Sequence, residues 1–149
     1  MDKNKYEEFV IFRILEQEFC IEMQATRELR SWTPSTSLPN SDEYVVGIIN
    51  LRGNILPIVD LAVRLGFPPN TKNERRVIIV VQHMEHQFGL LVDDVSDIIS
   101  ISPDQVRPVP TLKSEATEKF FKQVIVMEKR IICQILLDQF SPNIDKIAV

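Results

Sequence analysis

The sequence predicts an all-β protein, and three observations carry that prediction. Short apolar segments rich in β-branched residues recur at residues 9–15, 19–23, 45–51, 55–59, 77–81, 88–92, 124–127 and 131–136. Many of these segments are only a few residues apart, which favours antiparallel hairpins over parallel strands joined by crossover helices. Several are apolar throughout, VIIVV at residues 77–81 above all, which predicts that both faces of those strands are covered. Two small sheets or barrels packed against each other would provide that cover.

In chain order, the first two apolar segments are followed by residues 22–30, which fit either an extended edge or a helical turn. Two polar, proline-bearing stretches at residues 33–42 and 102–117 are predicted loops. The clearest helix follows Asp60, whose side chain can cap the first free backbone amides of residues 61–65. Gly66 can take the left-handed conformation that ends a helix, and Pro68 follows. Helices should therefore be few and short.

Length and charge narrow the functional classes. The 149 residues suit one compact domain or two very small subdomains with a common core, and we expect residues 1–149 to form a single domain. The net charge of −4 disfavours the basic stripe that binds nucleic acid or an anionic membrane surface. The charged start and the lack of an apolar run of about 20 residues predict a cytoplasmic protein with no direct membrane insertion. Cys20 and Cys133 lie among apolar neighbours, which is typical of buried thiols rather than of a disulfide or zinc site.

The stretch Asn50-Leu51-Arg52-Gly53-Asn54, between two apolar segments, has the composition of a tight hairpin turn. One interpretation is that Arg52 is simply a solvated arginine at a turn. The other is that a stiff hairpin holds Arg52 outward as a recognition anchor, because its planar donors suit carboxylates and exposed carbonyls. The residues alone leave both open.

The string VxGIINLRGxILPIVDLxxxLG, at residues 45–66, resembles the signature of CheW-like domains, the adaptors that link bacterial chemoreceptors to a histidine kinase. Further landmarks agree in order and spacing, so the resemblance covers nearly the whole chain: YEEFVIFRILEQEFCI at residues 6–21, RELR at 27–30, LP at 38–39, RVIIVV at 76–81, FGLLVD at 88–93, VSDI at 95–98 and IICQILLD at 131–138.

The resemblance implies two small five-stranded SH3-like β-barrels packed on a shared hydrophobic core, and it implies binding without catalysis, metal or cofactor. It implies that the cytoplasmic tip of a chemoreceptor docks in the groove between the barrels. The residues implied to face the receptor are Arg52, Thr26, Glu28, Gly47 and Gly53. The regulatory domain of a CheA-type histidine kinase should pack end to end against the other barrel, and we expect Gly89, Leu90 and Val92 to take part.

This chain departs from the family pattern in its last hairpin. Lys122-Gln123-Val124 occupies a region where members commonly have a glycine, and Cys133-Gln134 interrupts a last strand that is mostly aliphatic in the family. Pro142 should also end early the helix that closes other members.

Two alternatives to the coupling adaptor remain. The first is a divergent CheW-like regulator that competes with the main coupler or serves a non-flagellar chemosensory array. The second is a small hydrolase or metal enzyme built on Asp93, Asp94 and Asp97, although such an acidic group is more often a solvated rim. His83 and His86 flank a predicted hairpin tip, and two ligands alone make a poor metal site.

Overall fold

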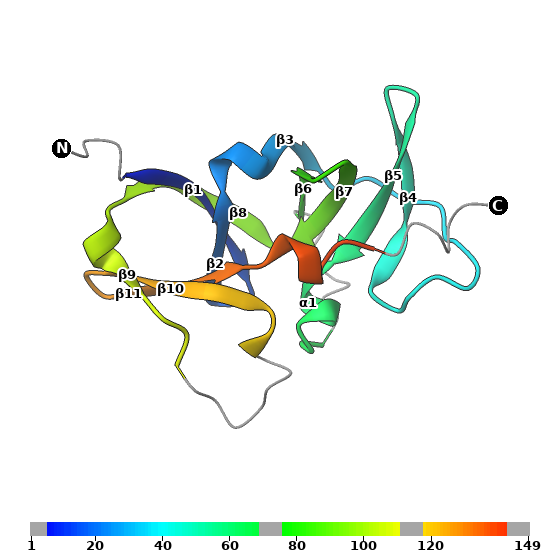
Figure 1. Ribbon diagram of the computed structural model, residues 1–149. Coiled ribbons are helices and arrows are strands. Elements are labelled where there is room, and N and C mark those ends of the chain that lie inside the picture. Colours follow the sequence, from blue (N-terminus) through cyan, green and yellow to red (C-terminus); the bar gives the residue numbers. More distant parts are fainter. Residues whose placement is uncertain (1–5, 69–75, 111–117, 143–149) are drawn as a thin grey trace.

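The computed structural model describes residues 6–68, 76–110 and 118–142, which form two antiparallel-rich sheets lying side by side (Figure 1). The six-stranded sheet has the order β8-β1-β2-β11-β10-β9. Its strands are β1 (Glu7–Ile14), β2 (Gln17–Glu22), β8 (Asp94–Ile101), β9 (Val106–Arg107), β10 (Phe121–Met127) and β11 (Arg130–Ile135). The five-stranded sheet has the order β3-β6-β7-β5-β4. Its strands are β3 (Thr26–Ser31), β4 (Val45–Leu51), β5 (Asn54–Asp60), β6 (Val77–His83) and β7 (His86–Val92).

The six-stranded sheet is rolled, as its connectivity requires. Strands β8 and β9 form its two edges, which in a flat sheet would be about 24 Å apart. The chain from Ile101 to Val106 can reach at most about 18 Å, and the 3₁₀ helix η2 (Pro103–Gln105) shortens it further. The two edges must therefore curve toward each other.

A comparable connection joins the edges of the five-stranded sheet. The chain leaving β3 crosses to β4 on the opposite edge, where Thr36 pairs with Ile48. The Thr36 amide donates to the Ile48 carbonyl at 2.9 Å, and the Ile48 amide donates to the Thr36 carbonyl at 2.8 Å. This crossing covers part of the β4 edge.

The apolar side chains divide into three clusters that explain the continuous apolar runs. Along β6, Ile79 and Val81 enter the core between the sheets, whereas Ile78 and Val80 enter the interior of the five-stranded sheet. Both faces of the strand are thus buried, as the VIIVV run predicts. The shared core between the sheets consists of Val10, Phe12, Ile14, Phe19, Ile21, Val59, Leu61, Ala62, Ile79, Val81, Phe88, Leu90, Val92, Phe120, Ile135 and Phe140. The interior of the six-stranded sheet holds Phe9, Ile11, Cys20, Ile101, Ile125 and Ile132.

The helix α1 (Leu61–Arg64) begins where the sequence predicts. The Asp60 carboxylate accepts hydrogen bonds from the Ala62 amide at 3.1 Å and the Val63 amide at 3.4 Å. Gly66 has a φ of 91°, the left-handed conformation expected just beyond the helix. Asp60 is buried, and Arg76 Nη1 lies 3.8 Å from its carboxylate. Burial raises the pKa of Asp60, and the capping amides and Arg76 only partly oppose that rise.

The all-β class, the short helices and the two sheets on one shared core are confirmed. Residues 22–30 combine both predicted alternatives: the 3₁₀ helix η1 (Met23–Ala25) is followed by the edge strand β3. Residues 102–117, predicted as a loop, contain η2 and the short strand β9, which gives one sheet six strands instead of five; residues 111–117 lie outside the described residues. Close to the C-terminal end of the described residues, the 3₁₀ helix η3 (Leu137–Gln139) stops before Pro142, as predicted.

Candidate functional site

The β4–β5 hairpin ends in a two-residue turn that presents Arg52. Arg52 and Gly53 have φ angles of 51° and 86°, the positive pair that a type I′ turn requires. The Asn50 side-chain oxygen accepts a hydrogen bond from the Gly53 amide at 2.9 Å and so fixes the turn. The hairpin extends well beyond the neighbouring strands (Figure 1). Arg52 is therefore held away from the sheet on a locally rigid support.

The Arg52 guanidinium forms an ion pair with Glu28 of β3, and its side chain is 68% exposed. Glu28 also lies 3.5 Å from the Arg30 guanidinium. Since β3 and β4 are opposite edges of the sheet, the Arg52–Glu28 pair spans the open end of the rolled five-stranded sheet. A depression of about 350 Å³, which we call the barrel mouth, lies there and is lined by Arg27, Glu28, Leu51, Arg52, Asn54, Val80 and Gln87.

The other residues predicted to face the receptor, Gly53, Thr26 and Gly47, lie in the turn, at the start of β3 and within β4. Gly53 belongs to the turn itself. Thr26 begins β3 and is half-buried, two positions before Glu28 and separated from it by a register shift. A Cβ on Gly47 would lie 2.6 Å from Ser35 Oγ and 2.6 Å from the Thr36 carbonyl oxygen, so this glycine permits the close crossing onto β4. Arg52, Glu28 and Gly53 therefore come together, whereas Thr26 and Gly47 flank them.

A second, larger depression lies between the sheets and is separate from the barrel mouth. This inter-sheet groove has a volume of about 380 Å³. It is lined by Ile21, Glu22, Gln24, Ala25, Gln82, His83, Met84, Lys122, Gln134, Ile135, Leu136, Leu137 and Asp138. None of the five residues predicted to face a receptor lines it, so the predicted single groove consists of two depressions.

The prediction that Gly89, Leu90 and Val92 form a kinase contact needs correction. All three are buried on β7, and Leu90 and Val92 belong to the shared core. A Cβ on Gly89 would lie 2.6 Å from Ile58 Cδ1 and 2.7 Å from Ile78 Cγ2. The glycine is needed for packing, because β7 lies between β6 and β5 in the centre of the sheet. These residues cannot reach a partner without unfolding the sheet.

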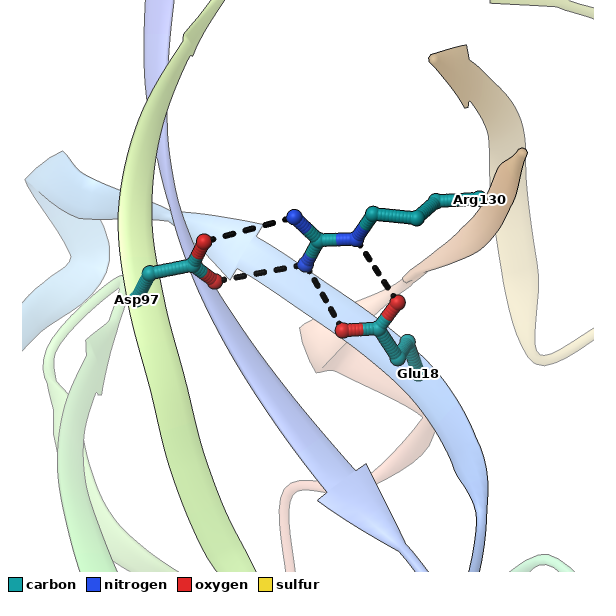
Figure 2. Close-up of polar contacts among 3 residues, drawn as sticks. All are labelled: Glu18, Asp97 and Arg130. Carbon is teal, nitrogen blue, oxygen red and sulfur yellow. Dashed lines mark hydrogen bonds and ion pairs between the residues drawn. The ribbon is translucent and has the colours of Figure 1, made fainter. Parts of the chain in front are cut away.

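The sequence interpretation missed a charged network that joins three strands of the six-stranded sheet. Arg130 donates through Nε and Nη2 to Glu18 at 2.9 and 2.7 Å, and through Nη1 and Nη2 to Asp97 at 3.3 Å each (Figure 2). The three residues come from β11, β2 and β8, and their spacing in the sequence gives no signal of the contact. Strand register explains it, since Glu18 pairs with Ile132, two residues beyond Arg130.

The three acidic residues Asp93, Asp94 and Asp97 have different surroundings. Asp93 accepts a hydrogen bond from the Leu15 amide at 2.6 Å and so holds the β1–β2 turn, whereas Asp97 binds Arg130. Asp94 is exposed at the start of β8. Within residues 6–68, 76–110 and 118–142, no three His, Cys, Asp or Glu side chains are grouped so as to hold a metal ion. Among the described residues, the three carboxylates therefore do not converge on one site.

The two cysteines are placed as buried thiols. Cys20 lies inside the six-stranded sheet, where burial first and the neighbouring Cys133 second raise its pKa far above the ordinary value. Burial also raises the pKa of Cys133. Both thiols therefore stay protonated at neutral pH, which makes them poor nucleophiles. Across the described part of the chain, no helix is long and apolar enough to cross a membrane.

Comparisons with a family model and with known proteins all point to the same family. The CheW-like domain family matches residues 8–141. A Rhizobium etli protein named "Probable chemotaxis protein CheW" is 45% identical over 131 residues, covering 88% of this chain and 84% of that protein. The Rhizobium meliloti "Chemotaxis protein CheW" is 44% identical over 136 residues, covering 91% and 88%.

A solved structure supports the same relationship. The crystal structure of the scaffolding protein TtCheW from Thermoanaerobacter tengcongensis superposes with a TM-score of 0.81 at 28% identity, covering 87% of this chain and 88% of that one. Sequence match, relatives and fold agree over nearly the whole length, and the chain belongs to the CheW-like domain family.

Proposed function

We propose that this chain is a non-enzymatic adaptor that couples chemoreceptors to a CheA-type histidine kinase in the cytoplasm, at membrane-bound receptor arrays. The observation that carries the proposal is the exposed Arg52 on a rigid turn, paired with Glu28 across the barrel mouth. The names of the relatives, chemotaxis proteins CheW, and of the solved scaffolding protein TtCheW support the same role. On this proposal, residues 1–149 act as one binding module.

The barrel mouth has the properties of a receptor-facing anchor. An arginine forms directional, charge-assisted hydrogen bonds, and a turn that fixes its backbone lowers the entropy lost on binding. Glu28 orients the guanidinium before a partner arrives, and Gly53 permits the turn. Thr26 and Gly47 shape the flanking backbone. We propose that the receptor tip contacts this mouth and that Arg52 is its principal anchor.

The kinase contact must lie elsewhere on the surface. Because Gly89, Leu90 and Val92 are buried, we propose that the regulatory domain of the kinase binds other, exposed residues outside the barrel mouth. Replacing Arg52 should therefore separate the two activities, weakening receptor binding and sparing kinase binding.

The alternative role, a divergent regulator that competes with the main coupler or serves another array, has one observation in its favour. The last hairpin departs from the family pattern and buries Gln134 in a strand of apolar neighbours. Such a change suits a copy adapted to a different receptor.

Two assays with purified protein test these roles: a binding titration tests both, and a kinase assay distinguishes between them. Calorimetry should detect binding to both a receptor signalling-tip fragment and the regulatory domain of the cognate kinase. A coupler increases receptor-dependent kinase autophosphorylation when it is added to receptor and kinase alone, whereas a competitor lowers it when added to a complex already formed with the main coupler. Absence of binding to both partners would refute either role.

A further inference from the structure

The half-buried side chain of Arg64, at the end of α1, joins three segments that are far apart in the sequence. Its Nε atom donates a hydrogen bond to the Gln139 carbonyl at 3.0 Å. Its guanidinium carbon lies 4.7 Å from the centre of the Tyr44 ring and 4.9 Å from the centre of the Phe120 ring. A guanidinium this close to two aromatic rings is attracted to both. Arg64 therefore connects the chain before β4 and the chain before β10 with η3.

The segment that Arg64 holds is residues 136–142, which we call the strap; it follows β11, contains η3 and lies beside α1 (Figure 1). The backbone amides at positions 139–141 donate within the strap, at 3.0 to 3.1 Å. These internal bonds do not attach the strap to the sheets. Its first amide, that of Leu136, donates to the Phe120 carbonyl at 2.8 Å. The buried Phe140 ring lies against Phe120, with 5.3 Å between the ring centres. Arg64 adds an attachment from α1, which follows β5 of the other sheet.

The strap forms one wall of the inter-sheet groove, through residues 136–138. Arg64 is not among the residues that line the groove or the barrel mouth. The groove lining also includes residues 24–25, and the lining of the barrel mouth begins close by, at Arg27. A displaced strap would thus alter the surface beside the mouth and leave the mouth itself intact.

Resting on the proposed receptor-coupling function, we infer that Arg64 is a positioning residue, which holds the strap closed in the form that the receptor binds. Such a residue contacts no partner. It acts on binding because a ligand that binds one of two arrangements favours that arrangement over the other. A neutral side chain cannot replace Arg64, because both the hydrogen bond and the attraction to the rings come from the guanidinium.

Hydrogen exchange of the strap amides in the full chain tests the role of Arg64. Arg64→Met keeps an apolar stem and removes the charge and the donor. The amides at positions 139–141 should then exchange at least about fivefold faster, the effect of losing one hydrogen bond on a local opening. Arg64→Lys keeps a cation near the rings and should restore part of the protection.

Two control variants separate the strap from charge and from overall stability. Arg107→Met removes an arginine that also donates to a backbone carbonyl, that of Asp104 at 2.6 Å, within its own turn. Ile132→Val lowers stability inside the six-stranded sheet, away from the strap. Both should leave strap exchange at the wild-type rate, because the strap opens without unfolding the sheets.

A receptor signalling-tip fragment tests the link to binding. At 100 times its dissociation constant, the fragment should slow strap exchange in wild type about 100-fold, because a ligand that binds only the closed form suppresses opening by that factor. Calorimetry supplies the dissociation constant.

The outcomes distinguish the inference from the proposed function. Strap exchange in Arg64→Met that matches wild type, or that is matched by either control, shows that Arg64 does not hold the strap. Strap exchange that bound receptor does not slow shows that the receptor does not require the closed form. Either result overturns the inference and leaves the proposed function standing. If wild type binds neither receptor nor kinase, both are wrong.

Discussion

Arg52 contributes little to the fold, because its side chain is 68% exposed and its ion pair with Glu28 spans the barrel mouth at the surface. We therefore predict that Arg52→Ala leaves thermal unfolding and circular dichroism unchanged. Receptor binding should weaken by about 2 kcal/mol or more, roughly 30-fold, as is typical when an interface anchor is truncated. Calorimetric titration with a receptor tip fragment measures this.

Arg13→Ala provides the matched control for Arg52, since Arg13 is an exposed arginine on β1 of the other sheet. It should bind the receptor fragment as wild type does. Equal loss of affinity in both variants would indicate a general effect of positive charge and would remove Arg52 as the anchor.

Three glycines should respond differently to alanine, because different atoms meet the new methyl group. At Gly47 the obstacles include the backbone oxygen of Thr36, whereas at Gly89 they are the side-chain methyl groups of Ile58 and Ile78, which can move. Gly53 has open space but a φ of 86°. We predict a loss of about 1–3 kcal/mol in the free energy of unfolding at Gly47 and Gly89, larger at Gly47, and of about 1 kcal/mol at Gly53. Urea denaturation ranks the three; Gly53→Ala as the most damaging would contradict the turn geometry.

At the scale of elements, the cap of α1 makes a prediction about pH. The pKa of Asp60 is raised from its ordinary value of 3.8, mainly by burial. The folded state therefore holds a proton more tightly than the unfolded chain, so this group's stabilising contribution is complete below pH 3.8 and is lost as pH rises through the raised folded pKa. Asp60→Asn keeps the cap without titrating.

Urea unfolding of wild type and Asp60→Asn, from about pH 4 to pH 7, isolates this contribution. The free energy of unfolding of wild type minus that of the variant should fall as pH rises. A difference that stays constant or rises would show that Arg76 and the capping amides outweigh burial.

The Arg130 network joins β11 to β2 and β8 within the six-stranded sheet. The side chains of Arg130 and Glu18 are 33% and 15% exposed, so the pair is only partly screened. Arg130→Ala leaves the Glu18 carboxylate without its bidentate partner. We predict a loss of about 1–2 kcal/mol in the free energy of unfolding, between the values for exposed and buried pairs. A matched variant, Lys129→Ala in the adjacent turn, should change stability by less than about 0.5 kcal/mol, and equal losses in both would contradict the network.

Elements with a strong local signal were predictable from the sequence, and those held by pairing with distant strands were not. Asp60, Gly66 and the Asn50–Gly53 turn carry capping and turn chemistry that acts within a few residues. Strand β8 (Asp94–Ile101) alternates exposed and partly buried residues along a sheet edge, so it lacks a continuous apolar run. The two-residue β9 exists only because β10 pairs with it.

The candidate sites also divide into features with a local sequence signal and features that depend on contacts between distant strands. Arg52 was predictable because turn chemistry places it at a tip. Its pairing with Glu28, 24 residues away, depends on the rolling of the sheet, which no local pattern records. Leu90 and Val92 were misassigned because the sequence does not distinguish an apolar residue buried in the core from an apolar residue exposed at a binding surface.

At the scale of the whole molecule, the two sheets should unfold as one unit because they share a core. Trp32, the single tryptophan, packs against the interior of the five-stranded sheet. Ile132→Val removes one methyl group inside the other sheet and should lower stability by about 1 kcal/mol. Tryptophan fluorescence and circular dichroism should report the same shifted transition. Fluorescence that does not move would show independent domains.

The central claim, that this chain couples receptors to a kinase through Arg52, is tested most directly by one reconstitution. Kinase autophosphorylation is measured with receptor-containing membranes and kinase, together with wild-type protein, Arg52→Ala or no added protein. We predict strong receptor-dependent activity with wild type, and activity close to that without the protein for Arg52→Ala, although kinase binding is retained. Equal activity with wild type and Arg52→Ala, or no stimulation by wild type, would contradict the account.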